Sequence, residues 1–262
     1  MSGFTLSKHA LFTGLLLLIA SAAKAGESST TLYVQCGASS GLNSIGAALK
    51  ALKHSEDSGP SKINVSGACQ ENVVIQNIDR LTIAGSRGAS ITDASGDAAD
   101  VVDIRNSNVT ITGMTIDGLS AVNNDAVDCE QGSHCTLLGN TIQGGADPVG
   151  VYTLSSALIV GGVLQNGTAS GIFALGDVTA VGVLIHGNPV GMVVNAGGRA
   201  RLVFLDPASF PGFTATQPTV EDNGAGVQVN QAQFACAGCI IQGNSGDGIN
   251  ADVSSEVRVA PG

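Results

Sequence analysis

The apolar residues of this chain recur in short groups of three positions, in which two apolar residues flank a third residue of variable type. Val127 and Cys129, for example, flank Asp128. Such alternation over a few residues is typical of short β-strands. Seven groups follow one another, anchored at Val102, Val127, Val151, Ile172, Met192, Val227 and Ile249. The anchors are 25, 24, 21, 20, 35 and 22 residues apart, and the longest interval holds one ordinary repeat plus an insertion. The pattern therefore predicts a repeat of about 22 residues with three short strands and three turns.

One strand of this length cannot bury a face alone, so we expect the repeats to stack as coils around a shared apolar interior. This predicts an all-β fold, a single-stranded parallel β-helix over residues 60–262. The spacing of leucine-rich repeats, the rival solenoid, is absent. Asn188, Asn223 and Asn244 each lie three residues after the apolar anchor of the last strand of a coil. Either they form a ladder of amides along the stack, or they are present because turns favour Asn.

The segment before the coils, residues 26–59, is predicted to contain a strand and an amphipathic helix. Leu42, Ile45, Leu49 and Leu52 share one helical face, with Asn43 or Ser44 as the N-cap. We expect this helix to cap the first coil. No such helix follows the last coil, which predicts an end that could associate with a partner or a second copy.

Residues 1–25 have the pattern of a secretory signal peptide. Lys8 and His9 precede an apolar run, and Ala23-Lys24-Ala25 is an A-x-A cleavage site. We therefore expect a secreted or periplasmic protein. No later segment is long and apolar enough to cross a bilayer.

The charge of the remaining chain excludes some partners. Without Lys8 and Lys24, 9 of the 11 basic residues face 21 acidic ones, a net charge of −12. Such a chain lacks the basic surface that nucleic acids and anionic lipids require. A polyanionic sugar would also be repelled unless metal ions intervened.

The six cysteines predict disulfides in an exported chain. Cys36 with Cys69 is the favoured pair, because it would hold the helix against the first coil. Cys129 and Cys135 flank one corner of a coil. They either form a disulfide across that corner or remain as two buried free thiols. Cys236 and Cys239 form one C-x-x-C, for which we expect a structural role rather than redox or metal chemistry.

Candidate chemistry lies on the outward positions of two neighbouring coils. The alignment places Asp103 and Arg105 beside Asp128 and Glu130 on one sheet face. Carboxylates at the spacing of neighbouring strands can raise one another's pKa or hold a cation. The alternative is an ordinary solvated strand face on which Arg105 neutralises its neighbours.

An apolar strip is predicted beside these acids, and it is the candidate ligand-binding surface. It consists of Tyr152, Leu154, Phe173 and Leu175. An aromatic and apolar strip beside carboxylates suits a sugar groove. The insertion at 205–217 either borders such a groove or is an inert surface loop.

The coils over roughly 60–260, with their apolar triplets, Gly and Asn corners and amphipathic helix, resemble the right-handed parallel β-helix proteins of the pectin-lyase-like superfamily. The resemblance implies a right-handed coil and export. It also implies either action on acidic polysaccharides or an adhesive role. Residues 123–128, Asn-Asn-Asp-Ala-Val-Asp, are similar to the N-T-D-G-x-D of polygalacturonases, and His186-Gly187 is similar to their H-G. The D-D pair and R-I-K of that family are absent, and the repeats from Asp100 onward contain no lysine that a calcium-dependent lyase could use.

Two functions follow. The favoured one is a non-catalytic exported β-helix, without a cofactor, that binds an extracellular glycan or serves as an adhesive stalk. The alternative is a polysaccharide lyase, hydrolase or epimerase that acts through Asp103, Asp128 and Glu130, with calcium in the case of a lyase.

Overall fold

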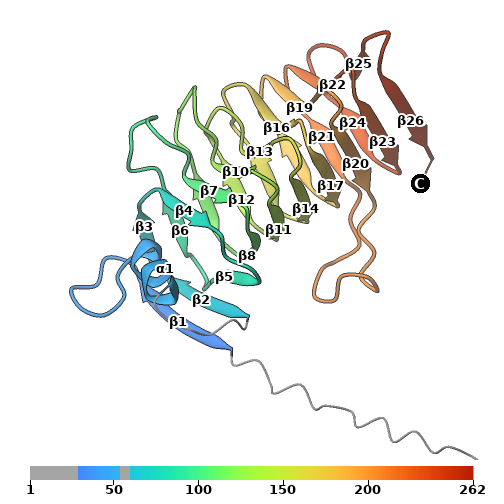
Figure 1. Ribbon diagram of the computed structural model, residues 1–262. Helices are drawn as coiled ribbons and strands as arrows, with labels where there is room; N and C mark the ends of the chain where they lie inside the picture. The colour runs from blue at the N-terminus through green and yellow to red at the C-terminus, as the bar shows by residue number, and fades with distance from the viewer. Residues whose placement is uncertain (1–28, 54–59, 262) are drawn as a thin grey trace, which may run out of the picture.

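The structure is a computed structural model that describes residues 29–53 and 60–261. The predicted signal peptide and the boundary at residue 59 lie outside the described residues. The fold is a parallel β-solenoid of about nine turns. Its coils are stacked along one axis, from β1 (Thr30–Gln35) and α1 (Ile45–Lys53) at one end to β26 (Glu256–Ala260) at the other (Figure 1).

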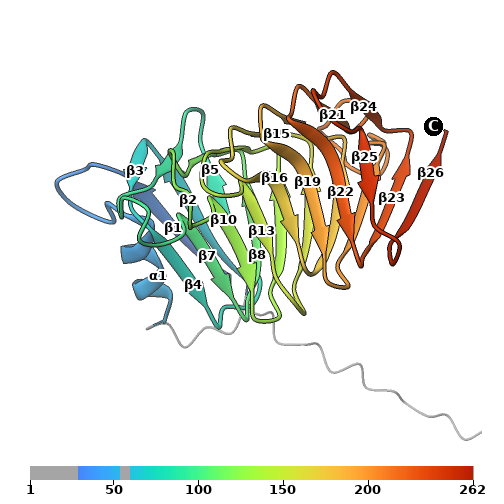
Figure 2. The same cartoon turned by 90° about the horizontal axis from the view of Figure 1, so that it is seen from above.

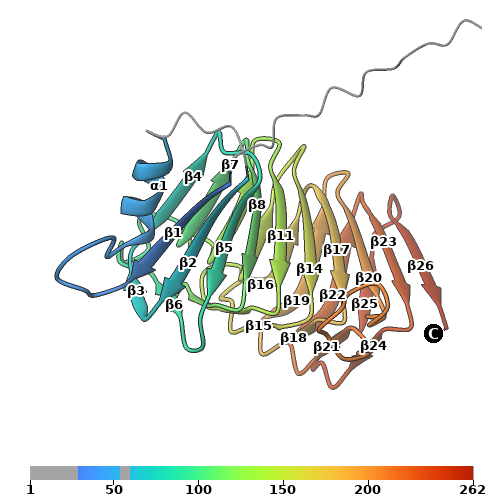
Figure 3. The same cartoon turned by 90° about the horizontal axis from the view of Figure 1, so that it is seen from below.

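Three parallel sheets form the walls of the solenoid, and we call them sheets A, B and C. Sheet A has ten strands, most of them visible side by side in Figure 3: β1, β2 (Ser61–Ser66), β5 (Leu81–Gly85), β8 (Asn108–Thr112), β11 (His134–Leu138), β14 (Ser156–Val160), β17 (Asp177–Val181), β20 (Arg199–Val203), β23 (Gln233–Ala237) and β26. Sheet B has eight strands: β3 (Ala68–Gln70), β6 (Ser90–Thr92), β9 (Thr115–Asp117), β12 (Thr141–Gln143), β15 (Val163–Gln165), β18 (Leu184–His186), β21 (Thr219–Glu221) and β24 (Ile240–Gln242). Sheet C also has eight and faces the viewer in Figure 2: β4 (Val73–Gln76), β7 (Val102–Arg105), β10 (Val127–Glu130), β13 (Val149–Val151), β16 (Ser170–Ala174), β19 (Val190–Asn195), β22 (Ala225–Asn230) and β25 (Ile249–Ala251).

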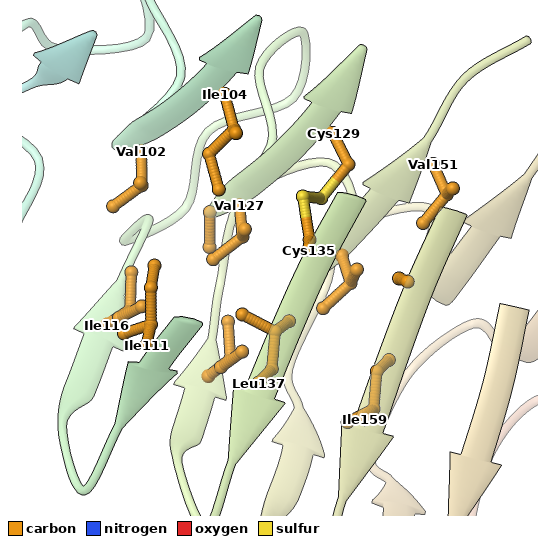
Figure 4. Packing of buried hydrophobic residues seen from close by; sticks show 14 of the residues in the cluster. Val102, Ile104, Ile111, Ile116, Val127, Cys129, Cys135, Leu137, Val151 and Ile159 are labelled. Carbon is orange, nitrogen blue, oxygen red and sulfur yellow. A yellow bond between two sulfur atoms is a disulfide. The ribbon is translucent and has the colours of Figure 1, made fainter. Parts of the chain in front are cut away.

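The predicted interior is confirmed. Val127 and Cys129 of β10 are fully buried, and they face Leu137 of β11 and the corresponding residues of neighbouring coils (Figure 4). Each sheet thus contributes alternate residues to one continuous apolar channel, because side chains of a strand point to opposite faces in turn. Burial of these valines, isoleucines and leucines is the main stabilising contribution to the stack.

The predicted register is wrong by two residues at one coil. Val127 pairs with Val149, not with Val151, and Val149 pairs with Ile172. Both valines are buried on either side of Gly150, and a shift of two residues keeps the same face inward, so alternation alone does not distinguish them. As a consequence Gly150, rather than Tyr152, lies opposite Asp128.

The predicted helix is present from Ile45 rather than from Leu42. It packs against β1, β2 and β4 and buries Ile45 and Leu49 in the core. Ser44 is its N-cap, since the Ser44 Oγ accepts a hydrogen bond from the Ala47 N–H at 3.1 Å. The Glu71 carboxylate accepts two more, from the N–H groups of Ile45 at 2.7 Å and of Gly46 at 3.0 Å. The first turn of the helix is thereby bonded to the loop between β3 and β4.

All six cysteines are paired in three disulfides: Cys36–Cys69, Cys129–Cys135 and Cys236–Cys239. The first joins the end of β1 to β3, as predicted. The second crosses the interior corner between β10 and β11, where Figure 4 shows its sulfur–sulfur bond. The third uses both sulfur atoms of the C-x-x-C, so Cys236 and Cys239 cannot bind a metal as thiolates while the bond is intact.

The asparagine ladder is also confirmed. The Asn188 side-chain amide donates to Asn223 Oδ1 at 3.0 Å, and the Asn223 amide donates to Asn244 Oδ1 at 3.1 Å. Each Oδ1 also accepts the backbone N–H of the preceding asparagine. The turns from sheet B to sheet C are therefore bonded to one another along the stack.

The insertion at 205–217 leaves the stack between β20 and β21 as a long loop (Figure 1). Leu205 and Thr216 form an antiparallel bridge, and Leu205 is buried against Val160 and Val181 in a second, smaller apolar cluster. Phe213 lies over Gly161, where a β-carbon would be only 2.9 Å from its ring. The insertion is therefore packed against three successive coils and is not a loose loop.

Among the described residues, no helix has the length and apolar character needed to span a membrane.

Candidate functional site

The predicted acidic residues do lie together on sheet C. Asp128 of β10 is the direct neighbour of Asp103 of β7, and Glu130 is the neighbour of Arg105. The Arg105 guanidinium lies 2.6 Å from an Asp103 oxygen and 2.7 Å from a Glu130 oxygen. The hydrogen bond with Asp103 raises the pKa of Arg105. The only cation among these four residues is thus engaged by two of the three acids.

The alternative of a solvated strand face is wrong at both aspartates, although Arg105 does neutralise its neighbours as that alternative expected. Asp103 is 5% exposed and Asp128 is 7% exposed, although both point away from the apolar channel. Asp100 and Asp125, in the turn that precedes sheet C, lie close to Asp128. This turn was not part of the predicted site. Its position is not deducible from strand alternation.

Aspartates in this turn form a ladder that the sequence analysis missed. An Asp100 oxygen accepts the Asp125 N–H at 2.6 Å, and an Asp125 oxygen accepts the Asp147 N–H at 3.1 Å. Asp147 in turn accepts the N–H of Ser170 at 2.7 Å. The signal that could have found it is an Asp two residues before the first inward residue of three successive coils, at 100, 125 and 147.

Asp128 is the member of the cluster whose bonding is incomplete. Its Oδ1 is buried and has no hydrogen-bond partner. One oxygen each from Asp100, Asp125 and Asp128 lie within 4.8 Å of one another, and so do oxygens from Asp103, Asp128 and Glu130. Both groups could hold a metal ion, and Asp128 belongs to both.

Gly150 makes room for this arrangement. It lies opposite Asp128, and a β-carbon at this position would overlap the Asp125 carboxylate. The Tyr152 hydroxyl approaches the same carboxylate from the next positions of the chain and donates a hydrogen bond to Asp125 Oδ2 at 3.3 Å. The Asp125 carboxylate therefore occupies the space that a side chain at position 150 would need.

The electrostatics of the cluster favour protons or cations. Burial, followed by the charges of Asp147 and Asp100, raises the pKa of Asp125 to about 8. Burial, followed by the charge of Asp100 and of the other nearby acids, raises the pKa of Asp128 to about 9. Burial also raises the pKa values of Asp100, Asp147 and Tyr152. Burial and the neighbouring carboxylates therefore favour the protonated forms of Asp125 and Asp128 when no cation is bound.

The predicted apolar strip is present only in part. The rings of Tyr152 and Phe173 are in contact, with centroids 5.9 Å apart. Both rings are half-buried, as is Leu175, whereas Leu154 is 86% exposed. The strip therefore offers a solvent-facing platform mainly at Leu154.

A hollow that the sequence did not predict lies on the outer face of sheet A, near α1. It has a volume of about 580 Å³. Its lining includes Tyr33, Gln35, Leu42, Asn64, Ser66 and Ser86. Tyr33 is 74% exposed, and none of the residues that line the hollow carries a charge. The hollow escaped prediction because it combines β1, β2 and β5 with the loop before α1.

A second hollow on the same face, of about 260 Å³, lies toward the other end of sheet A. Arg199, Arg201 and Arg258 line it together with Glu256. Arg258 pairs with Glu256 at 2.5 Å. This hollow gathers three cations in a chain of net negative charge.

Comparisons with family models, with curated proteins and with solved structures find no match to this chain.

Proposed function

We propose that the chain is an exported, non-catalytic parallel β-helix that binds a neutral extracellular polysaccharide on the outer face of sheet A. The observation that carries this proposal is the hollow at Tyr33. A sugar ring stacks on an exposed aromatic face, while amides and hydroxyls such as those of Asn64 and Ser66 bond its hydroxyl groups. The uncharged lining favours a neutral polymer over a polyuronate.

The burial of the acidic cluster supports the non-catalytic reading. An enzyme acting through Asp103 and Asp128 needs these carboxyls within hydrogen-bond reach of a substrate. Both are more than nine-tenths buried, and Arg105 is already bonded to Asp103 and Glu130.

Export is supported by the three disulfides, since such bonds persist in oxidising compartments. The signal peptide at 1–25 accords with it. The pectin-lyase-like resemblance adds a right-handed coil, which is the hand of nearly all connections between parallel strands. The burial of α1 against β1, β2 and β4 supports its role as the cap of the first coil.

The binding test is affinity electrophoresis of the chain without residues 1–25 through gels that contain a β-glucan, a mannan, a xylan or polygalacturonate. We expect retardation by a neutral polymer, a loss of affinity of at least about tenfold in Tyr33→Ala, and near-normal affinity in Tyr33→Phe, which keeps the ring. Phe173→Ala and Leu154→Ala test the strip on sheet C. Loss of binding there, with Tyr33→Ala unaffected, would move the ligand to that strip.

The enzyme alternative is tested on the same polymers. Release of reducing ends or unsaturated products in the presence of calcium, abolished by Asp128→Asn, would overturn the non-catalytic proposal. We expect no release by the wild type.

A further inference from the structure

We propose that Asp100, Asp125 and Asp128 form a calcium site that joins two successive coils of the solenoid. The site is independent of polysaccharide binding, because it lies on sheet C and the turn before it. Asp100 lies just before β7. Asp125 and Asp128 belong to the next coil, where Asp125 lies just before β10 and Asp128 lies within it. An ion held by all three would bond one coil to the next.

The first observation is geometric. One oxygen from each of the three carboxylates lies within 4.8 Å of the other two. Calcium binds oxygen ligands at about 2.3–2.6 Å, so two oxygens on opposite sides of one ion are about 4.6–5.2 Å apart. The three oxygens are therefore close enough to share one ion.

The second observation is the free oxygen of Asp128. Its side chain is more than nine-tenths buried, yet Oδ1 has no hydrogen-bond partner among the described residues. A buried polar atom without a partner is costly, and native structures usually satisfy it with a donor, a water or an ion. Since the Asp128 carboxylate belongs to the group of three, an ion bound among them would give this side chain the partner that it lacks.

The third observation is the charge around the group. Asp103 and Glu130 add two more acids, and the one neighbouring cation, Arg105, is bonded to these two. No described positive side chain is bonded to Asp100, Asp125 or Asp128. A divalent cation would supply the missing positive charge.

The ligand chemistry favours calcium. The donors are carboxylate oxygens, with the Tyr152 hydroxyl bonded to one of the carboxylates, and hard oxygen donors suit calcium and magnesium rather than zinc or copper. Cys129, which follows Asp128 in the chain, is in a disulfide with Cys135. Calcium tolerates irregular sites, whereas magnesium needs near-octahedral geometry and keeps most of its waters.

A terbium experiment tests the location directly. Terbium replaces calcium at oxygen sites and luminesces when a nearby tyrosine is excited. The chain has two tyrosines and no tryptophan. Tyr152 is bonded to Asp125, whereas Tyr33 lies on sheet A, near α1. We expect sensitised emission that calcium displaces, that Tyr152→Phe abolishes and that Tyr33→Phe, the matched control, preserves. Emission that instead depends on Tyr33, or no calcium-displaceable emission, would overturn the proposal.

Calorimetry and thermal unfolding of EDTA-treated protein provide the second test. We expect binding of one calcium ion and a rise in Tm of about 5 °C or more at a calcium concentration one hundred times the Kd, with a smaller rise in magnesium. Asp100→Asn and Asp128→Asn should lose both effects. Asp177→Asn, an exposed acid of β17, should keep them.

Glu130→Gln distinguishes the two overlapping groups. If this variant loses calcium while Asp100→Asn keeps it, the ion lies among Asp103, Asp128 and Glu130, and the assignment is wrong. If Asp128→Asn fails to fold, Asp100→Asn at a partly exposed position still decides the question. No heat of binding and no rise in Tm for the wild type would overturn the proposal outright.

Discussion

Gly150 of β13 lies directly opposite Asp128 of β10, and the space above its missing side chain holds the carboxylate of Asp125. The acidic cluster therefore depends on a glycine that contributes no chemistry of its own. The backbone of Gly150 does not require a glycine, because its φ is not in the left-handed region.

Gly150→Ala is accordingly expected to destabilise the protein by steric overlap. The new β-carbon would displace the Asp125 carboxylate, and inserting a methyl group into a filled space costs about 1–3 kcal/mol. Urea unfolding measures the effect. Gly248→Ala is the control, because its β-carbon would meet only Ile241 at 3.7 Å. Equal stability of the two variants would contradict the described packing around Asp125.

The stability of the calcium-free protein should fall as the pH rises from about 5 to about 9. Asp125 and Asp128 have folded-state pKa values of about 8 and about 9, above the usual 3.8. In this window the folded state binds more protons than the unfolded state, so each rise in pH favours unfolding. Thermal unfolding in EDTA across this range measures the slope. Asp128→Asn should flatten it, whereas a wild-type Tm that rises with pH would contradict the raised pKa values.

The asparagine ladder should be among the most sensitive polar positions. Asn223 is buried and bonds Asn244, the carbonyl of Ile185 and the N–H of Asn188. Asn223→Ala leaves these groups without partners in the turn, at a cost of about 1–3 kcal/mol for each group left unsatisfied. Asn230→Ala, which removes only an exposed bond to Asn195, is the control. Similar midpoints in urea for both variants would contradict a structural ladder.

The insertion should stabilise the coils that it covers. Leu205→Ala removes a buried side chain from the cluster with Val160 and Val181, which typically costs about 2–5 kcal/mol. Leu154→Ala, at a highly exposed leucine, should change the free energy of unfolding by less than about 0.5 kcal/mol. If Leu205→Ala were as stable as the wild type, the insertion would not be packed as described.

The coil repeat and its interior were predictable because inward residues must be apolar and alternate with outward ones, as Val127 and Cys129 do. Of the three disulfides, Cys36–Cys69 was predicted as a pair, and Cys129–Cys135 confirms one of the two alternatives left open for that corner. The register at Val151 was missed because Val149 is equally apolar and faces the same way. The apolar pattern alone therefore predicts which face of a strand points inward more securely than it predicts which residues pair with the next strand.

The site was less predictable, and the reason is its location in turns. Asp103 and Asp128 were found because they lie on strands, where alternation fixes their direction. Asp100 and Asp125 precede the strands, and only the turn conformation brings their carboxylates close to that of Asp128. The hollow at Tyr33 escaped for a related reason, since it joins coils and a loop that no single repeat contains.

Binding of a neutral polysaccharide by Tyr33→Ala and by Asp128→Asn, measured side by side, tests the central claim most directly. The claim is that sheet A binds the ligand, while the acids of sheet C hold the coils together. We predict that Tyr33→Ala loses at least about tenfold in affinity and that folded Asp128→Asn binds as the wild type does. Loss of binding in Asp128→Asn with full binding in Tyr33→Ala would contradict it.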